Sequence, residues 1–268
     1  MIERTFQLVK GVGPWREKDI WAKGFPDWAA FEKASEVVAS AGIDAELREA
    51  IAKARGASLG ELAQMIPERE HWRLYPHFVD QAAFLDLEAD GDEQITVGGV
   101  MDGAGVATFI RDFEGPKALQ QLATRLEQSP IWVTFNGGTF DIPVLRRHFP
   151  GLKSPLVHLD LRFLVRRVRL KGGLKEVEEH LGLHRPPHLK GIRGYDAIRL
   201  WREWQTTKNP DALRILVEYN LYDAINLRSL VDLCITRAAE QLAWDEPFRA
   251  PFERGDVLYD VSKLLLEL

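Results

Sequence analysis

The sequence predicts an α/β fold that follows a small N-terminal helical region. Short β-rich segments alternate with helical segments between residues 80 and 160, and helical patterns fill most of the chain after residue 170. The composition, with 46% hydrophobic and 28% charged residues, is that of a globular protein. Three strands, a helix, a strand, a helix, a strand and then helices form an α/β order.

Residues 1–75 are expected to be helical. Apolar residues recur at helical spacing in 31–40 and 45–54, and glycine and proline residues separate the segments. Aromatic residues and a proline gather between residues 71 and 79, which we interpret as a domain boundary. We therefore expect a helical N-terminal region at 1–75, a main domain at 80–240 and a C-terminal extension at 241–268.

The middle of the chain supplies the sheet. Strands are expected at 82–87, 94–101, 106–111, 131–135 and 156–159, with a hairpin turn at 102–105. Helices are expected at 116–128 and 139–148, and further along at 174–181, 195–205 and 211–237. Asp211 follows a proline and is a candidate cap for the last helix.

Charge and cysteine content limit the possible classes of protein. The net charge of −5 and the pI near 5.9 argue against attraction to nucleic acid through bulk charge, but they leave a local basic patch open. The single cysteine, Cys234, excludes an internal disulfide and a cysteine-cluster metal site, and its apolar neighbours predict a buried thiol. The sequence has no signal-peptide pattern and no segment near the roughly 18 apolar residues of a membrane span. We expect a cytoplasmic protein with no membrane partner.

Acidic residues occur where the pattern predicts the core. Asp86 and Glu88 alternate at the end of the first expected strand and therefore share one face, about 7 Å apart. Two carboxylates so close repel each other, and a divalent cation would relieve the repulsion. The alternative is a strand end that runs into a polar loop.

Two other acidic positions have plain explanations when each is taken alone. Asp141 lies in the first turn of the helix expected after the glycine turn at 137–138, where an acid also favours the helix dipole. Tyr219 and Asp223 are four residues apart on one helix face, which also suits a surface acid beside a half-buried tyrosine.

Together these features resemble the motifs of the DEDD superfamily of exonucleases, in the same chain order. The first motif is Asp86-Leu87-Glu88, the second combines Asn136 with Phe140-Asp141, and the third is Tyr219-Asn220-Leu221-Tyr222-Asp223, as in the tyrosine subclass. The segments 174–182 and 194–223 resemble the YprB-like branch, and the likeness covers about residues 80–235. The resemblance implies a ribonuclease H-like fold, with a mixed five-stranded sheet flanked by helices.

The resemblance also implies a function: a 3′–5′ exonuclease that acts on DNA or RNA. Asp86, Glu88, Asp141 and Asp223 would be the metal ligands, and Tyr219 would orient the attacking water. Asn136 would contact the substrate or support a ligand. Two divalent ions can catalyse phosphodiester hydrolysis, and oxygen ligands favour Mg²⁺ or Mn²⁺. The alternatives are a non-catalytic nucleic-acid-binding module on the same fold and a structure-selective endonuclease.

A basic stretch follows the fifth expected strand. Arg162, Arg166, Arg167, Arg169, Lys171 and Lys175 occur with no acid between them, and Arg185, Lys190 and Arg193 continue the stretch. Such a patch can hold a phosphate backbone, although an ordinary solvated helix face is the alternative. Asp160, just before this stretch, is either a helix cap or a further acid of the site. His184 and His188 are interpreted as loop residues rather than as a metal pair.

The N-terminal region contains a second candidate for contact with nucleic acid. The sequence around Gly11 and Gly13, followed by 19–24, resembles a helix-hairpin-helix motif. In that motif the glycines allow backbone N–H groups to approach a DNA phosphate, and Lys10 and Lys18 could assist. The alternative is a module that packs on the main domain.

Overall fold

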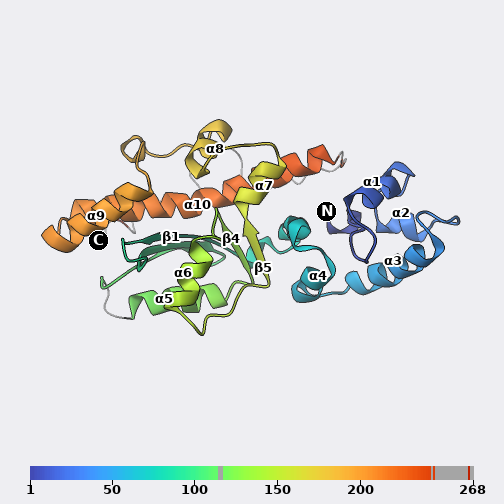
Figure 1. Cartoon of the computed structure of the whole chain (residues 1–268), viewed down its shortest axis with the longest axis horizontal. Helices are drawn as coiled ribbons and strands as arrows, with labels where there is room; N and C mark the ends of the chain where they lie inside the picture. Colours follow the sequence, from blue (N-terminus) through green and yellow to red (C-terminus); the bar gives the residue numbers. More distant parts are fainter. Residues whose placement is uncertain (114–116, 243, 245–264, 266–268) are drawn as a thin grey trace. The chain divides into compact units, whose positions relative to one another are not determined.

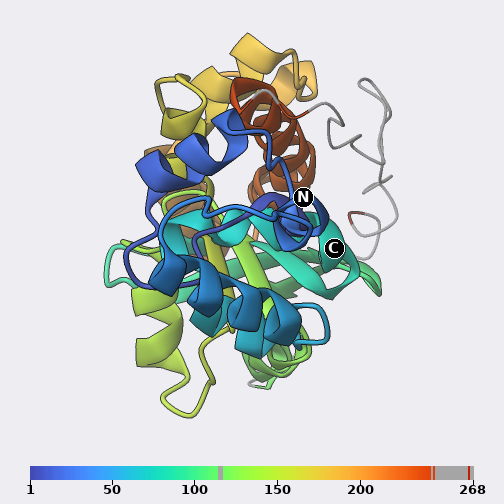
Figure 2. The same cartoon turned by 90° about the vertical axis from the view of Figure 1, so that its right-hand side faces the viewer.

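A computed structural model describes residues 1–113, 117–242, 244 and 265. The chain divides into two compact units, Met1–Val79 and Asp80–Leu268, which are described separately. Figure 1 draws the first unit in blue to cyan and the second in green to red, and Figure 2 shows the same drawing turned by 90°. The expected helix start at residue 116 and most of the expected extension at 241–268 lie outside the described residues. None of the described helices has the length and hydrophobicity of a membrane span.

The first unit consists of α1 (Pro14–Ala22), α2 (Trp28–Glu32), α3 (Ala41–Ala54), α4 (Leu59–Met65) and short 3-10 segments. The helix expected at 45–54 lies within α3, but the one expected at 31–40 is wrong, because α2 ends at Glu32. The Asp44 carboxylate accepts hydrogen bonds from the backbone N–H groups of residues 38, 39 and 40, and the Ser40 hydroxyl caps α3. These side-chain acceptors hold the backbone out of the helix that its apolar spacing favours.

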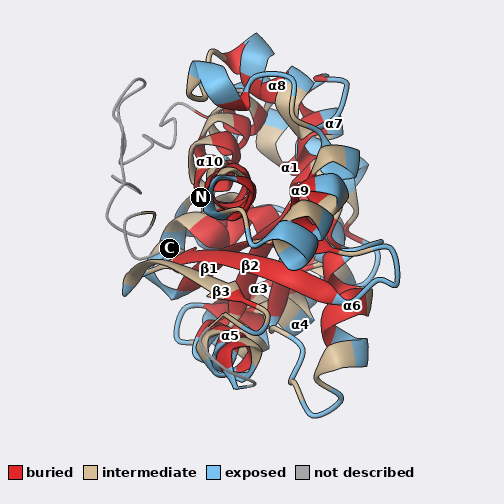
Figure 3. Ribbon diagram, turned by 90° about the vertical axis from the view of Figure 1, so that its left-hand side faces the viewer, coloured by how far each residue is buried: buried red, intermediate tan, exposed pale blue. Residues whose placement is uncertain are grey.

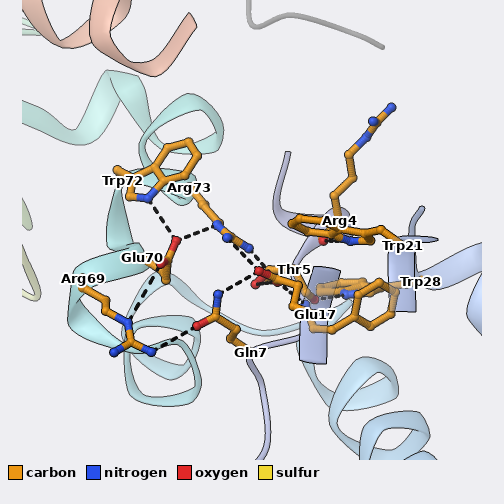
Figure 4. A network of polar contacts seen from close by, with 11 residues as sticks. Arg4, Thr5, Gln7, Glu17, Trp21, Trp28, Arg69, Glu70, Trp72 and Arg73 are labelled. Atoms are coloured by element: carbon orange, nitrogen blue, oxygen red, sulfur yellow. Dashed lines mark hydrogen bonds and ion pairs between the residues drawn. The ribbon is translucent and has the colours of Figure 1, made fainter. Parts of the chain in front are cut away.

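A buried ion-pair network joins the two ends of the first unit (Figure 4). Arg73 and Glu17 are each 1% exposed, and both guanidinium NH groups donate to the Glu17 carboxylate at 2.8 and 2.9 Å. Glu17 also accepts from the Phe6 backbone N–H at 2.8 Å, while Glu70 forms an ion pair with Arg73 at 3.0 Å. Because each buried charge has a partner, the network links residues 5–17 to residues 70–73 without leaving an isolated ion.

The second unit is built on a five-stranded mixed sheet, as expected. Its strands are β1 (Ala82–Ala89), β2 (Ile95–Asp102), β3 (Gly105–Ile110), β4 (Ile131–Thr134) and β5 (Val157–Asp160), in the order β3-β2-β1-β4-β5. The first three strands pair antiparallel, whereas β1, β4 and β5 are parallel. The carboxyl ends of these three parallel strands therefore meet at one edge of the sheet.

Helices cover both faces of the sheet (Figure 3). On one face, α5 (Ala118–Glu127) and α6 (Asp141–His148) pack Leu122, Leu126 and Leu145 against the core strands. The other face is covered by α10 (Pro210–Gln241), against which α7 (Leu161–Arg167), α8 (Leu174–Leu181) and α9 (Gly194–Thr207) pack. Cys234 lies buried in α10, as expected.

Two details of the helices differ from expectation. Asn209, not Asp211, caps α10, because its side-chain oxygen accepts the Asp211 backbone N–H at 3.1 Å. The seven-residue helix α7 was not among the expected helices, although the cap interpretation of Asp160 implied a helix at this place. Asp160 caps it by accepting the Arg162 backbone N–H at 3.0 Å, so the cap interpretation of Asp160 is confirmed.

Candidate metal and nucleic-acid site

The first two acidic residues of the site stand on β1, beyond its last parallel pair with β4. That pair is Phe84 with Val133, so Asp86 and Glu88 project past the carboxyl end of β4. Alternation along the strand places them on the face opposite Leu85 and Leu87, which pack in the core with α5 and α6. The acidic pair therefore faces the α10 side of the sheet.

The long helix α10 brings a third carboxylate to the first two. One carboxylate oxygen from each of Asp86, Glu88 and Asp223 lies within 4.8 Å of the other two. Asp223 and Glu88 are buried, while Asp86 is partly exposed. We call these three residues the acidic cluster. Tyr219, one helical turn before Asp223, is also buried.

Asn220 fixes the distance between α10 and β1. Its side-chain amide donates to the Asp86 backbone carbonyl at 3.0 Å and to the Asp86 carboxylate at 2.8 Å. A Cβ at Gly99, the β2 partner of Asp86, would lie 2.5 Å from Asn220 Oδ1, so the helix can approach the sheet only over a glycine. Both residues were missed as parts of the site, although Asn220 lies inside the third motif and Gly99 is in a glycine pair within a strand.

Asp141 lies next to the acidic cluster at the start of α6. It is 3% exposed, and its Oδ1 accepts a hydrogen bond at 3.0 Å from the backbone N–H of Leu87, between the two acids of β1. Burial raises the pKa of Asp141 to about 7, and the charges of Asp160 and Asp223 contribute, against the hydrogen bonds from backbone N–H groups. The fourth acid of the motifs is thus held beside the other three by the backbone of β1.

The carboxylates destabilise one another's charged forms. Loss of hydration, followed by the charges of Asp223 and Glu88, raises the pKa of Asp86 well above its ordinary value. The pKa of Glu88 is raised well above its ordinary value by burial and by Asp223, while Lys175 opposes the rise. A bound cation would remove this repulsion, so the arrangement favours metal binding electrostatically.

Two basic side chains from outside the sheet reach the cluster. The Lys175 ammonium, on α8, donates to the Tyr219 hydroxyl at 2.5 Å and lies 3.4 Å from one carboxylate oxygen of Asp223. The Arg185 guanidinium contacts the other oxygen of Asp223 and forms two hydrogen bonds of 2.7 Å to Glu178. Lys175 was expected among the phosphate contacts, and the structure places its charge at the acidic cluster.

Tyr219 is held in its protonated form. Burial, and then the negative charges of Asp223 and Glu88, raise the pKa of the Tyr219 hydroxyl. Its oxygen accepts the Lys175 hydrogen bond, which leaves the O–H available as a donor. The tyrosine can therefore orient a neighbouring oxygen atom but cannot serve as a base at neutral pH.

Asp160 organises the turn after β4. Its two carboxylate oxygens accept the backbone N–H groups of Asn136 at 2.7 Å and Gly138 at 3.1 Å. The Arg162 guanidinium donates to the Asn136 side-chain oxygen, and Asn136 itself has a φ of 63°. Asp160 therefore joins the start of α7 to the turn that leads into Asp141, and its charge contributes to the raised pKa of Asp141.

The remaining basic residues lie further along the same segment. Arg166 and Lys171 are exposed and Arg167 is half-buried. Among the loop histidines, His188 lies 2.7 Å from Glu218 and His184 is exposed. Arg162 thus remains close to the site through its hydrogen bond to Asn136, whereas Arg166 and Arg167 lie further along α7.

The glycine turn of the first unit has an α-helix on one side. Gly13 precedes α1, and Gly11 adopts a φ of +90°, but only the three-residue 3-10 helix Ile2–Arg4 comes before the turn. The Arg16 side chain donates to the Gly11 carbonyl at 2.6 Å. The expected helix on the N-terminal side is therefore missing from the helix-hairpin-helix pattern.

Comparison with known proteins places the site in a family. A model described as the RNase H superfamily matches residues 83–235, more than half of the chain, and the match spans all four acids and Tyr219. No curated protein and no solved structure matches the chain significantly. The mixed sheet flanked by helices agrees with this fold, and nucleases that have it typically use divalent metals. The chain belongs to the RNase H superfamily.

Proposed function

We propose that the protein is a metal-dependent 3′–5′ exonuclease of the tyrosine-containing DEDD class, in its YprB-like branch. The observation that carries this proposal is the acidic cluster, in which carboxylates of β1 and α10 approach within 4.8 Å beside the buried Asp141. Residues 137 positions apart in the sequence supply this cluster, so it is a product of the fold rather than of local composition.

The donor set fits hard divalent cations. Carboxylate oxygens are the ligands preferred by Mg²⁺ and Mn²⁺, and repulsion within the cluster favours cation binding. Asp86, Glu88, Asp141 and Asp223 would hold two ions. When bound, such ions stabilise the charge of the phosphate and acidify a bound water.

The protein's own groups have distinct roles in this proposal. Tyr219, protonated and fixed by Lys175, donates its O–H to the attacking water and orients it. Asn220 holds Asp86 in place, and Arg185 holds Asp223. Asn136 and Arg162 lie where the turn into Asp141 meets α7, a position suited to contact with the nucleic-acid backbone.

The test is hydrolysis of end-labelled single- and double-stranded DNA and RNA with Mg²⁺, Mn²⁺ or excess chelator. Stepwise loss of nucleotides from the 3′ end is expected with metal, and Asp223→Asn should abolish it. The matched control is Asp211→Asn, an exposed acid on the same helix. Full activity in chelator would refute the proposal.

The two alternative functions, an endonuclease and a non-catalytic binding module, predict different results in the same assay. Cleavage of a circular substrate, which has no ends, would identify an endonuclease. Binding without turnover across all metals and substrates would identify a non-catalytic module. Gly11 and Gly13 stay a proposed DNA contact of the first unit, tested by duplex binding of the Gly13→Val variant.

A further inference from the structure

The surface of α7 carries an exposed aromatic side chain among arginines. Phe163 is 67% exposed, which is unusual for so large an apolar residue, and it follows Arg162 directly. Arg166 is also exposed and lies one helical turn further along. We call Arg162, Phe163 and Arg166 the α7 platform.

The ring cannot turn into the core, because the other face of α7 is already packed. Leu161, Leu164 and Val165 are buried there, and α7 lies against α10 (Figure 1). Residues three and four apart are neighbours on a helix surface, so Phe163 and Arg162 both lie next to Arg166, on its N-terminal side. The platform thus presents one aromatic ring next to two cationic groups.

Charge complementarity identifies the kind of partner. Residues 161–175 contain six basic residues and no acid, in a chain whose net charge is −5. Arginines bind phosphate oxygens, and an aromatic ring beside them offers a stacking surface for a base. Within a duplex the faces of the internal bases are covered by their neighbours, so along a strand a ring can stack only on an unpaired base.

Hydrogen bonds connect the platform to the turn before Asp141, which lies beside the acidic cluster. Asp160 caps α7 and also binds the turn at 136–138, while Arg162 donates to the Asn136 side chain. That turn leads directly into Asp141. These hydrogen bonds hold the start of α7 to the turn before Asp141, so a nucleic-acid strand lying on α7 would lie next to that turn.

We infer that the α7 platform binds an unpaired nucleic-acid strand, with Phe163 stacked on a base and Arg162 and Arg166 on neighbouring phosphates. The inference rests on the proposed nuclease function and names its substrate: the single-stranded end of a nucleic acid. Loss of a base–aromatic stack corresponds to a 5- to 150-fold loss of affinity, from roughly 1–3 kcal/mol per base.

The experiment measures binding of the full chain to fluorescent oligonucleotides by anisotropy. Chelator is present so that the oligonucleotides are not hydrolysed during the measurement. The probes are a single-stranded thymidine oligonucleotide, an abasic oligonucleotide of equal length and a blunt duplex. The variants are Phe163→Ala, Phe163→Trp and, as a control, Leu156→Ala, which removes an apolar side chain of comparable exposure before β5. Circular dichroism checks that each variant is folded.

Phe163→Ala should weaken binding of the thymidine oligonucleotide within that range, and Phe163→Trp should retain the binding. Neither the abasic probe nor the duplex should distinguish Phe163→Ala from the wild type. Equal affinity of Phe163→Ala and wild type for the thymidine probe, or an equal loss on the abasic probe, would overturn the inference.

Hydrolysis by the wild type with Mn²⁺ is measured in parallel. If the wild type hydrolyses the substrate and Phe163→Ala binds the thymidine oligonucleotide as tightly as the wild type, the platform alone is refuted. The expected binding pattern without any hydrolysis by the wild type would refute the nuclease function alone.

Discussion

Replacing Asp141 by asparagine should stabilise the metal-free second unit at alkaline pH while removing its proposed catalytic function. The pKa of Asp141 is raised to about 7 in the folded protein, chiefly by burial, whereas an aspartate in an unfolded chain titrates near 4. The folded state therefore binds this proton more tightly. Stability from this group is fully present below about pH 4 and is lost as the pH rises through 7.

The magnitude follows from the difference in pKa. About three pKa units at roughly 1.4 kcal/mol each correspond to about 4 kcal/mol, which is the upper limit of the effect. Asparagine keeps the oxygen that accepts the Leu87 backbone N–H, and it has no charge to bury. We expect Asp141→Asn to raise the free energy of unfolding at pH 8 by roughly 1–4 kcal/mol and to change it little at pH 4.

The assay is urea denaturation in chelator at pH 4, 6 and 8. Unfolding is monitored by amide hydrogen exchange of β1, so that the stability of the second unit is measured. The control is Asp211→Asn, an exposed acid that should show no such trend. When Mn²⁺ replaces the chelator, the difference in the free energy of unfolding between Asp141→Asn and wild type should become smaller or reverse, because bound metal stabilises only the folded wild type. Lower stability of Asp141→Asn than wild type at pH 8, or a difference independent of pH, would refute the reasoning.

Three further changes have defined outcomes. Gly99→Ala should destabilise the second unit by about 1–3 kcal/mol in urea denaturation and reduce nuclease activity, because the new Cβ would displace Asn220 from Asp86. The control Gly151→Ala, with open space around its Cβ, should change neither stability nor activity. Lys175→Met should move the acidic limb of the pH–activity profile to higher pH, since the ammonium lowers the pKa values of Asp86 and Glu88, and an unchanged profile would contradict that role. Glu17→Gln should destabilise the first unit by about 1–3 kcal/mol in thermal unfolding followed by circular dichroism, because the buried charge of Arg73 loses one carboxylate partner and keeps Glu70; no measurable loss would contradict this.

The sheet and the longer helices could be predicted because their periodicity is local. The apolar run at residues 82–87 and the helical spacing at 174–181 are each visible in neighbouring residues alone. The errors occurred where side chains bond to nearby backbone. Asp44 holds residues 38–40 out of a helix, and Asn209 captures the N–H of Asp211.

The order and type of the acidic motifs were visible in the sequence, since Asp86 and Glu88 share a strand face and Tyr219 and Asp223 share a helix face. Their motif resemblance implied a ribonuclease H-like fold, and the comparison shows the RNase H superfamily, whereas the DEDD class stays a prediction. The helix cap at Asp160 was likewise readable from its position after a strand.

Only the tertiary structure decided which charges meet. Lys175 and Arg185 looked like members of one basic stretch, yet Lys175 lies against Asp223, 48 residues away, and Arg185 contacts the same carboxylate. The fit of Asn220 over Gly99 was equally invisible, because it depends on how closely α10 packs on β2. Local patterns determine which face of an element is polar, whereas the partner that each polar group meets depends on long-range packing, which has no period in the sequence.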